Sequence, residues 1–225
     1  MSTSDSTRNG RRGRGSRAGL TQARIVEAAR GLGAESITVQ AVADRLGVDR
    51  AAVHHHVNDL DTLRELIALD AFTVRFAPVT IAPGADWREA CRLLAVSMHD
   101  AVLASGGLGA YVRLTPSDVA VLEPVEQTLG IMIAAGFDDE TAARSLTTLA
   151  GIAAATARER VIAGRQTGHP QAPAVRRAIE ENGDVELPVL YRLAQADLVA
   201  FDDAQLQASI DLVLDGMATR LRSDG

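Results

Sequence analysis

The stretch from residue 38 to residue 57 reads Thr-Val-Gln-Ala-Val-Ala-Asp-Arg-Leu-Gly-Val-Asp-Arg-Ala-Ala-Val-His-His-His-Val. Thr38 is a good N-cap, and the apolar residues at 39, 42, 43 and 46 follow it at helical spacing. Gly47 lies where a helix C-terminus favours a positive φ. Asp49 can cap a third helix that runs through His56. The stretch therefore predicts two short helices that meet across a tight glycine turn.

The side chains of this motif divide into a buried set and an outward set. The apolar residues expected to close the two helices onto a core are Val42, Leu46, Val48 and Val53, with the small Ala43 at the crossing. The residues left on the outer side of the third helix are Arg50, Ala51, His54 and His55. A short exposed helix of this kind can lie in a DNA major groove.

Helical periodicity continues on both sides of the motif. A helix capped by Thr21 is expected over about 21–33, and an apolar connecting helix over about 61–76. Further helices are expected over about 86–104, 117–135, 139–164, 172–181, 188–197 and 203–222, and no segment shows the period of two that is typical of a strand. The sequence predicts an all-α fold with a flexible arm at 1–19, a helix-turn-helix domain at 20–60 and a larger helical domain at 61–225.

Charge is distributed unevenly along the chain. Residues 1–58 hold nine Arg and five acidic residues, whereas the rest of the chain holds fourteen Arg and twenty-four acidic residues, for a net charge of −6. A basic first part favours a polyanionic partner. The arm carries several of these arginines, namely Arg8, Arg11, Arg12, Arg14 and Arg17, which we expect to enter a minor groove.

The order of these elements resembles the tetracycline-repressor (TetR/AcrR) family. The resemblance rests on a capped first helix, on Thr38-Val39-x-Ala41-Val42-Ala43-x-x-Leu46-Gly47-Val48, on a short third helix and on an apolar connecting helix, over about residues 20–75. It implies a homodimeric transcriptional regulator, usually a repressor, that binds a pseudo-palindromic operator and is released by a small effector. The chain departs from the family at His54, where an aromatic residue is usual, and at Leu60, where Lys is frequent.

The resemblance and the chemistry of the side chains suggest a role for each residue of the DNA-binding surface. We expect Arg50 and His55 to contact base edges and Ala51 to contact a thymine methyl group. The residues expected to contact phosphate are Thr38, Gln40 and His54, the first two because they lie at the positive end of a helix dipole.

In the family that this chain resembles, the larger domain encloses a small-molecule pocket. Candidate lining residues are the polar and bulky side chains along its apolar stretches, namely Trp87, Met98, His99, Tyr111, Met132, Phe137, Thr147, Thr148, Thr156 and Arg158. The few aromatic residues favour a largely apolar effector. The last helix repeats Leu206, Ile210, Val213, Met217 and Leu221, a seam that either packs inside the domain or faces a partner helix. The resemblance implies that this helix pairs with helix 139–164 across a two-fold axis.

The alternative function is that of a helical metal-dependent phosphohydrolase, similar to the HD superfamily, built on His99 and Asp100. Such a site needs His and Asp ligands from several helices. However, His99 continues the apolar stripe of its helix, and three successive histidines at 54–56 point about 100° apart on a helix, so that they cannot share one ion. We therefore expect no enzymatic activity, no metal and no cofactor.

Cysteine content and hydropathy suggest a compartment. Cys91 is the one cysteine of the chain, so no internal disulfide can form. The first residues lack the apolar core of a signal peptide, and no stretch reaches the ~18 apolar residues of a membrane span. We expect a cytoplasmic protein without a membrane partner.

Overall fold

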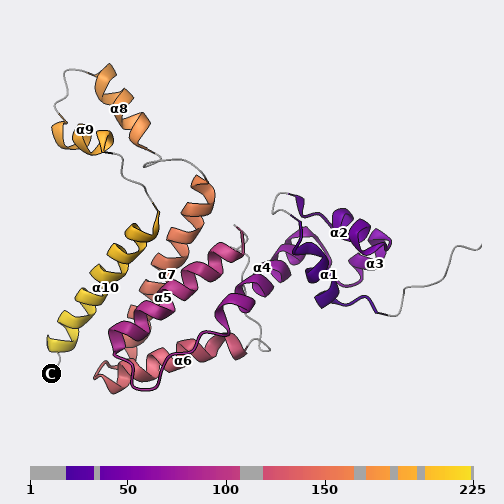
Figure 1. The fold of residues 1–225 in the computed structure, drawn as a ribbon, viewed down its shortest axis with the longest axis horizontal. Coiled ribbons are helices and arrows are strands. Elements are labelled where there is room, and N and C mark those ends of the chain that lie inside the picture. The colour runs from indigo at the N-terminus through magenta and orange to yellow at the C-terminus, as the bar shows by residue number, and fades with distance from the viewer. Residues whose placement is uncertain are drawn as a thin grey trace, which may run out of the picture. The chain divides into compact units, whose positions relative to one another are not determined.

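The computed structural model describes residues 19–32, 36–106, 119–164, 171–182, 187–196 and 201–223, and all regular secondary structure in these ranges is helical (Figure 1). The elements are α1 (Gln22–Ala29), α2 (Val39–Leu46), α3 (Arg50–His54), α4 (Leu60–Phe76), α5 (Trp87–Ala104), α6 (Val119–Ala134), α7 (Asp139–Ala163), α8 (Ala172–Glu181), α9 (Pro188–Gln195) and α10 (Asp203–Ser223). The chain divides after Leu63 into two compact units, and α4 runs across that division. The predicted all-α fold class is confirmed.

The N-terminal unit is built around the corner between α2 and α3. The Thr38 hydroxyl caps α2 by accepting the amide of Ala41 at 3.0 Å, as the sequence predicts. At the other end, Gly47 has φ 65° and ψ 34°, which is left-handed backbone that glycine adopts without strain. The amide of Val48 then donates to the carbonyl of Ala43 at 3.1 Å. These bonds satisfy the free ends of α2 and turn the chain into α3.

Each helix of this unit contributes at least one apolar side chain to its core. Its fully buried side chains include Ile25 of α1, Val42 and Ala43 of α2, Val53 of α3 and Val57 beyond it. Leu46 and Val48, which were expected in the same core, are only half-buried. Because Ala43 is small, α2 approaches its neighbours closely at that position, and Val42 and Val53 fill the centre.

Two of the predicted helices are shorter in the structure. α1 ends at Ala29, ahead of Gly31 and Gly33, since glycine is a poor helix former. α3 ends at His54, and Asp49 occupies its N-cap position without accepting a hydrogen bond from the helix. The other expected helices match those of the structure to within about two residues at each described end.

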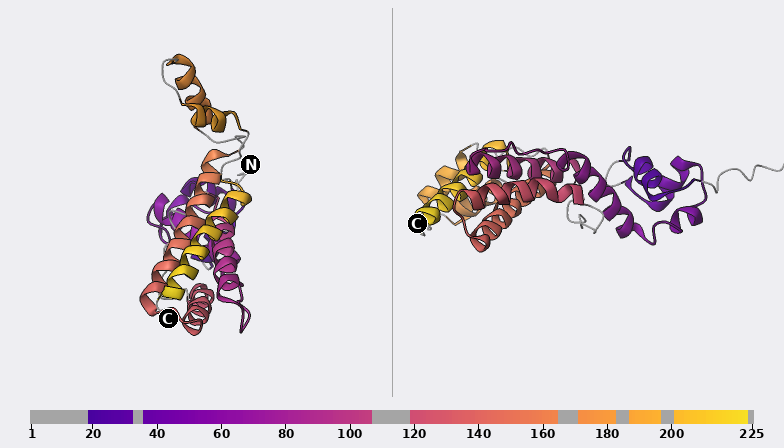
Figure 2. Two further views of the ribbon diagram at one scale, coloured as in Figure 1. Left: turned by 90° about the vertical axis from the view of Figure 1, so that its left-hand side faces the viewer. Right: turned by 90° about the horizontal axis from the view of Figure 1, so that it is seen from below.

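The C-terminal unit packs α5 against α6, α7 and α10, and the contact between α5 and α7 is the most extensive (Figure 2). One apolar cluster joins these helices around Cys91, Met132, Leu149 and Ile210. A second cluster gathers Phe72 and Phe76 of α4 with residues of α5, α6 and α7. α8 and α9 pack on each other.

The seam of α10 points into its own chain. Leu206, Ile210 and Met217 are buried, Val213 and Leu221 pack against the first cluster, and Leu214 joins them at the centre. Arg92 of α5 forms an ion pair with Asp211 of α10 at 2.5 Å. Of the two roles considered for this seam, packing inside the domain is therefore the observed one. Within the described ranges, no helix is long and apolar enough to span a membrane.

The left-handed conformation of Gly47 predicts the effect of a single methyl group. Gly47→Ala should destabilise the corner by about 1–2 kcal/mol, because the added Cβ meets no neighbour and only the backbone conformation opposes it. Hydrogen exchange measured on peptides from α2 and α3 should become about five to thirty times faster. Gly47→Asn should lose less, since Asn tolerates this conformation. Equal exchange in Gly47→Ala and wild type would contradict this explanation of the turn.

Candidate DNA-binding surface and ligand-binding unit

α3 has one buried side chain and an open outer face. Val53 is buried in the core, whereas Arg50 and His55 are exposed and Ala51 and His54 lie beside them on the same helix. The predicted outward set therefore lies on the surface of the unit. An exposed face of this size, with one Arg at its start, can reach base edges in a major groove.

Two consecutive hydrogen bonds link side chains and backbone along this outer face. The Nε of Arg50 donates to Nε2 of His54 at 3.2 Å, and Nδ1 of the same ring lies 3.2 Å from the carbonyl of Asn58. The i,i+4 spacing places Arg50 and His54 one helical turn apart. Both ring nitrogens of His54 therefore have a partner in the protein before any nucleic acid is bound.

The residues predicted to contact phosphate at the start of α2 are exposed. The Thr38 hydroxyl serves as the helix cap, and the side-chain Nε2 of Gln40 donates to Oδ1 of Asp44 at 2.7 Å. Their contact with phosphate stays a prediction, as do the base contacts of Arg50, Ala51 and His55. The arm residues Arg11, Arg12, Arg14 and Arg17 lie outside the described residues.

Two contacts that support this surface were not predicted from the sequence. The side-chain Nε2 of Gln22 in α1 donates to the carbonyl of His56 at 3.1 Å, which ties α1 to the residues that follow α3. The Arg45 guanidinium donates to the carbonyl of Gly31. A Cβ added to Gly31 would lie only 2.4 Å from a terminal nitrogen of this guanidinium. Gln and Arg are common at exposed helix positions, so no sequence pattern distinguishes Gln22 and Arg45 from other surface residues.

The predicted pocket residues fall into different environments. Trp87, Met132 and Phe137 belong to the first apolar cluster, in which the Trp87 and Phe137 rings meet edge to face at 5.0 Å. Met98 packs against both clusters. The remaining candidates lie elsewhere, because Thr147 and Thr148 are exposed on α7, Thr156 is buried, Arg158 is half-buried and Tyr111 lies outside the described residues.

His99 stands out among these candidates by its burial. The residue is 1% exposed, its Nδ1 lies 3.2 Å from the Asp100 carboxylate, and its Nε2 has no hydrogen-bond partner. Thr156 differs, since its hydroxyl donates to the carbonyl of Ile152 at 3.0 Å. Within the described part of the chain, no three His, Cys, Asp or Glu residues could together hold a metal ion, so the His99–Asp100 pair lacks a third ligand there.

Burial also determines the chemistry of Cys91. Loss of solvent and, to a lesser degree, the charge of Asp86 raise the pKa of the Cys91 thiol to about 12. A thiol with such a pKa is almost wholly protonated at neutral pH, and the thiolate is the nucleophilic form. Cys91 is therefore a packing residue of the first cluster.

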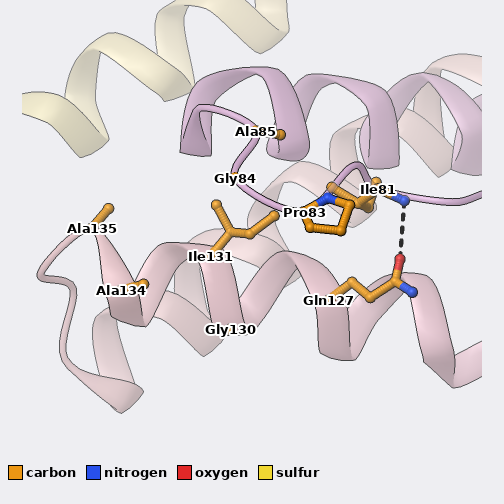
Figure 3. A pocket seen from close by; sticks show the side chains of 9 residues that line it. All are labelled: Ile81, Pro83, Gly84, Ala85, Gln127, Gly130, Ile131, Ala134 and Ala135. Atoms are coloured by element: carbon orange, nitrogen blue, oxygen red, sulfur yellow. Dashed lines mark hydrogen bonds between the residues drawn. The ribbon is translucent and has the colours of Figure 1, made fainter.

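The structure also contains a surface groove that the sequence did not predict (Figure 3). The loop after α4 contributes Ile81, Pro83, Gly84 and Ala85, and α6 with its C-terminal end contributes Gln127, Gly130, Ile131, Ala134 and Ala135. The groove has a volume of about 520 Å³. The amide of Ile81 donates to Oε1 of Gln127 at 3.0 Å, across 46 positions of sequence, and holds the loop on α6. Its walls are mostly apolar.

Comparison with known proteins places this architecture in a family. The family model of the tetracyclin repressor-like C-terminal domain matches residues 80–221, which is more than half of the chain. The comparison with curated proteins gives no match.

Solved structures share the fold over nearly the whole length of the chain. ActR of Streptomyces coelicolor in complex with (S)-DNPA is 21% identical, with a TM-score of 0.70, over 92% of this chain and 100% of that chain. ActR in complex with actinorhodin is 25% identical, with a TM-score of 0.66, over 89% and 96%. A single-residue variant of TetR from Acinetobacter baumannii AYE in complex with minocycline is 19% identical, with a TM-score of 0.59, over 88% and 94%.

The match to the family model, the helix-turn-helix at the start of the chain and the helical unit that follows agree with the resemblance found in residues 20–75. The chain belongs to the tetracycline-repressor (TetR) family of transcriptional regulators.

Proposed function

We propose that this protein is a homodimeric transcriptional repressor that binds a pseudo-palindromic operator through α3 and releases it when a small, largely apolar effector binds the C-terminal unit. The observation that carries the proposal is the outer face of α3, which presents Arg50 and His55 to solvent behind a fixed glycine corner. In a member of this family, such a face fits the role of the DNA-reading helix.

The proposed contacts keep the roles suggested by side-chain chemistry. Arg50 can bind guanine with two hydrogen bonds, and Ala51 can pack on a thymine methyl group. Thr38 and Gln40 take phosphates, whereas neutral His54 has no ring N–H left to donate to one. The arginines of the arm supply positive charge in place of the lysine that the family often has at the position of Leu60. These backbone contacts position the unit, whereas the contacts of α3 select the sequence.

An exposed face of α7 and α10 supports a dimer. Ile162 is 77% exposed and Leu212 is 76% exposed, although both lie on long helices whose other faces are well packed. Between the two helices runs a groove of about 200 Å³ whose lining includes Thr148 and Gly216. An added Cβ at Gly151 or Gly216 would meet nothing, so a second copy can approach both helices closely. A two-fold dimer pairs like surfaces in this way.

The C-terminal unit supports an effector site. The relatives named above were solved with (S)-DNPA, actinorhodin and minocycline, which are small molecules, and this chain has the same fold. His99 offers a buried ring nitrogen that has no hydrogen-bond partner, which suits a ligand held by few hydrogen bonds. Because α4 runs across the division between the units, a shift of α4 can pass effector binding to the DNA-binding unit. A coupling of ~1–3 kcal/mol changes operator affinity about 5- to 150-fold.

Selection of random duplexes by the purified protein tests this function. We expect the selected sequences to share two inverted half-sites, because a two-fold dimer presents α3 twice. Binding that is sensitive to salt but selects no common sequence would contradict the operator, and absence of any binding would contradict the proposal as a whole.

Removal of Arg50 tests the reading of bases. Arg50→Ala should lower affinity by ~1–3 kcal/mol for the selected operator and relax the preference at one base pair in each half-site. Titrations with operators that carry single base changes measure this effect. Arg30→Ala removes the same charge from the C-cap of α1, which is not among the proposed DNA contacts, and should leave the base preferences unchanged. A loss for Arg50→Ala that is uniform over all duplexes would reassign Arg50 to phosphate.

A charge placed on the exposed apolar face tests the dimer. Leu212→Glu should shift the protein to monomer in sedimentation velocity and weaken operator binding, since the face would then bury unpaired charges. Leu122→Glu makes the same change at an exposed position of α6 and should remain dimeric. A Leu212→Glu protein that stays dimeric would place the interface elsewhere.

Because Nε2 of His99 has no hydrogen-bond partner, replacing this buried polar residue by an apolar one should not destabilise the protein. His99→Leu should leave the free energy of unfolding unchanged or raise it, because the replaced Nε2 has no partner. Thr128→Val is the control, since Thr128 is also fully buried but its hydroxyl donates to the carbonyl of Pro124 at 2.8 Å. The free energy of unfolding of this variant should be about 0.5–1.5 kcal/mol lower than that of the wild type. Urea unfolding followed by Trp87 fluorescence measures both. A loss in His99→Leu as large as in the control would give His99 a structural role instead.

A further inference from the structure

We propose that neutral His54 is a positioning residue for Arg50, and that protonation of His54 lowers the preference of the protein for its operator over other DNA. The inference rests on the proposed function, because it assumes that Arg50 reads a base. It adds a specificity-determining residue and a dependence on pH to that function.

Two hydrogen bonds fix the tautomer of the His54 ring. The Asn58 carbonyl, 3.2 Å from Nδ1, can only accept, so Nδ1 carries the proton. In the neutral ring, Nε2 is then an acceptor. It lies 3.2 Å from Nε of Arg50, which can only donate. The two contacts thus agree on one neutral tautomer, and each would be lost in the other.

The bond to His54 leaves the reading end of Arg50 free. It engages Nε, whereas the two terminal nitrogens of the guanidinium are those that can bind guanine O6 and N7. An exposed arginine otherwise samples many rotamers and loses that freedom on binding. His54 therefore holds Arg50 in a narrower set of conformations before DNA arrives.

Protonation reverses the role of His54. A proton on Nε2 turns this acceptor into a donor that faces the donor Nε of Arg50, and it places two cations side by side. The bond breaks and Arg50 is released. The added positive charge meanwhile attracts any phosphate backbone. Affinity for unrelated DNA is thus maintained or raised while the advantage of the operator falls.

Arg50 is the charged residue to which the His54 ring is hydrogen-bonded. On its own segment lie Asp49, His55 and His56, and the capping residue Asp59 follows. Charged groups on α1 and α2 have other partners. Asp44 accepts from Gln40, Arg45 donates to the Gly31 carbonyl, and Glu27 forms an ion pair with Arg30. At the start of α4, Asp61, Arg64 and Glu65 each have an interaction of their own.

The experiment compares binding to the selected operator and to a scrambled duplex at about pH 8 and about pH 5.5, the range in which histidine changes charge. The affinity for the operator divided by the affinity for the scrambled duplex should be about two- to tenfold lower at about pH 5.5 than at about pH 8 in the wild type, as expected for the loss of one hydrogen bond. His54→Gln retains an acceptor oxygen but does not titrate, and its ratio should be the same at both pH values. His56→Gln is the matched control, because His56 is a neighbouring histidine that is not among the proposed DNA contacts, and this variant should behave like the wild type.

Arg50→Ala supplies a second variant, whose ratio should be lower and independent of pH. The tautomer is checked without DNA, because nitrogen NMR of the wild type at about pH 8 should show a protonated Nδ1 and a bare Nε2 in His54.

Three results would overturn the inference: a constant ratio in the wild type, an unchanged pH effect in His54→Gln, or the opposite tautomer. A protein that prefers no duplex at about pH 8 would overturn the proposed function and this inference together, whereas an operator preference that is independent of pH would overturn the inference alone.

Discussion

The DNA-binding surface depends on the closure of α2 at Gly47. The left-handed glycine lets the amide of Val48 return to the carbonyl of Ala43, so that α3 starts immediately and at a fixed angle. With only five residues, α3 has little stability of its own and is held by Val53 in the core. The same packing turns Arg50 and His54 outward. The position of the reading face thus follows from one backbone conformation and one buried valine.

The C-terminal unit is stabilised in a different way, because its long helices pack on one another through apolar contacts on several sides. Small residues of α7, such as Ala153 and Ala157, are fully buried and let α5 approach closely. α10 turns its seam toward these helices, which leaves Leu212 on the outside with Ile162 of α7. The unit is therefore well packed within one chain and still has an exposed apolar face, which is the proposed dimer surface. His99 introduces into this interior a ring nitrogen that has no hydrogen-bond partner.

Local features were predictable because they depend on a few neighbouring residues. Thr38 caps α2 and Gly47 ends it, and α8 covers the predicted 172–181. The outcome for the α10 seam was not predictable, because a stripe of apolar residues shows that a face is buried but not by which chain. The Ile81–Gln127 bond joins segments 46 residues apart and depends on the tertiary fold. The Arg50–His54 bond could have been found from its i,i+4 spacing, but the phosphate contact implied by the family was considered instead.

The central claim is that two copies of α3, fixed by the corner at Gly47, read two half-sites at once. A series of operators in which the half-sites are moved apart one base pair at a time tests it most directly. Affinity should peak at one separation, near one helical turn of about 10–10.5 base pairs or a multiple of it, and should fall when half a turn is inserted. Equal affinity at every separation would show that each chain binds alone and would contradict the account.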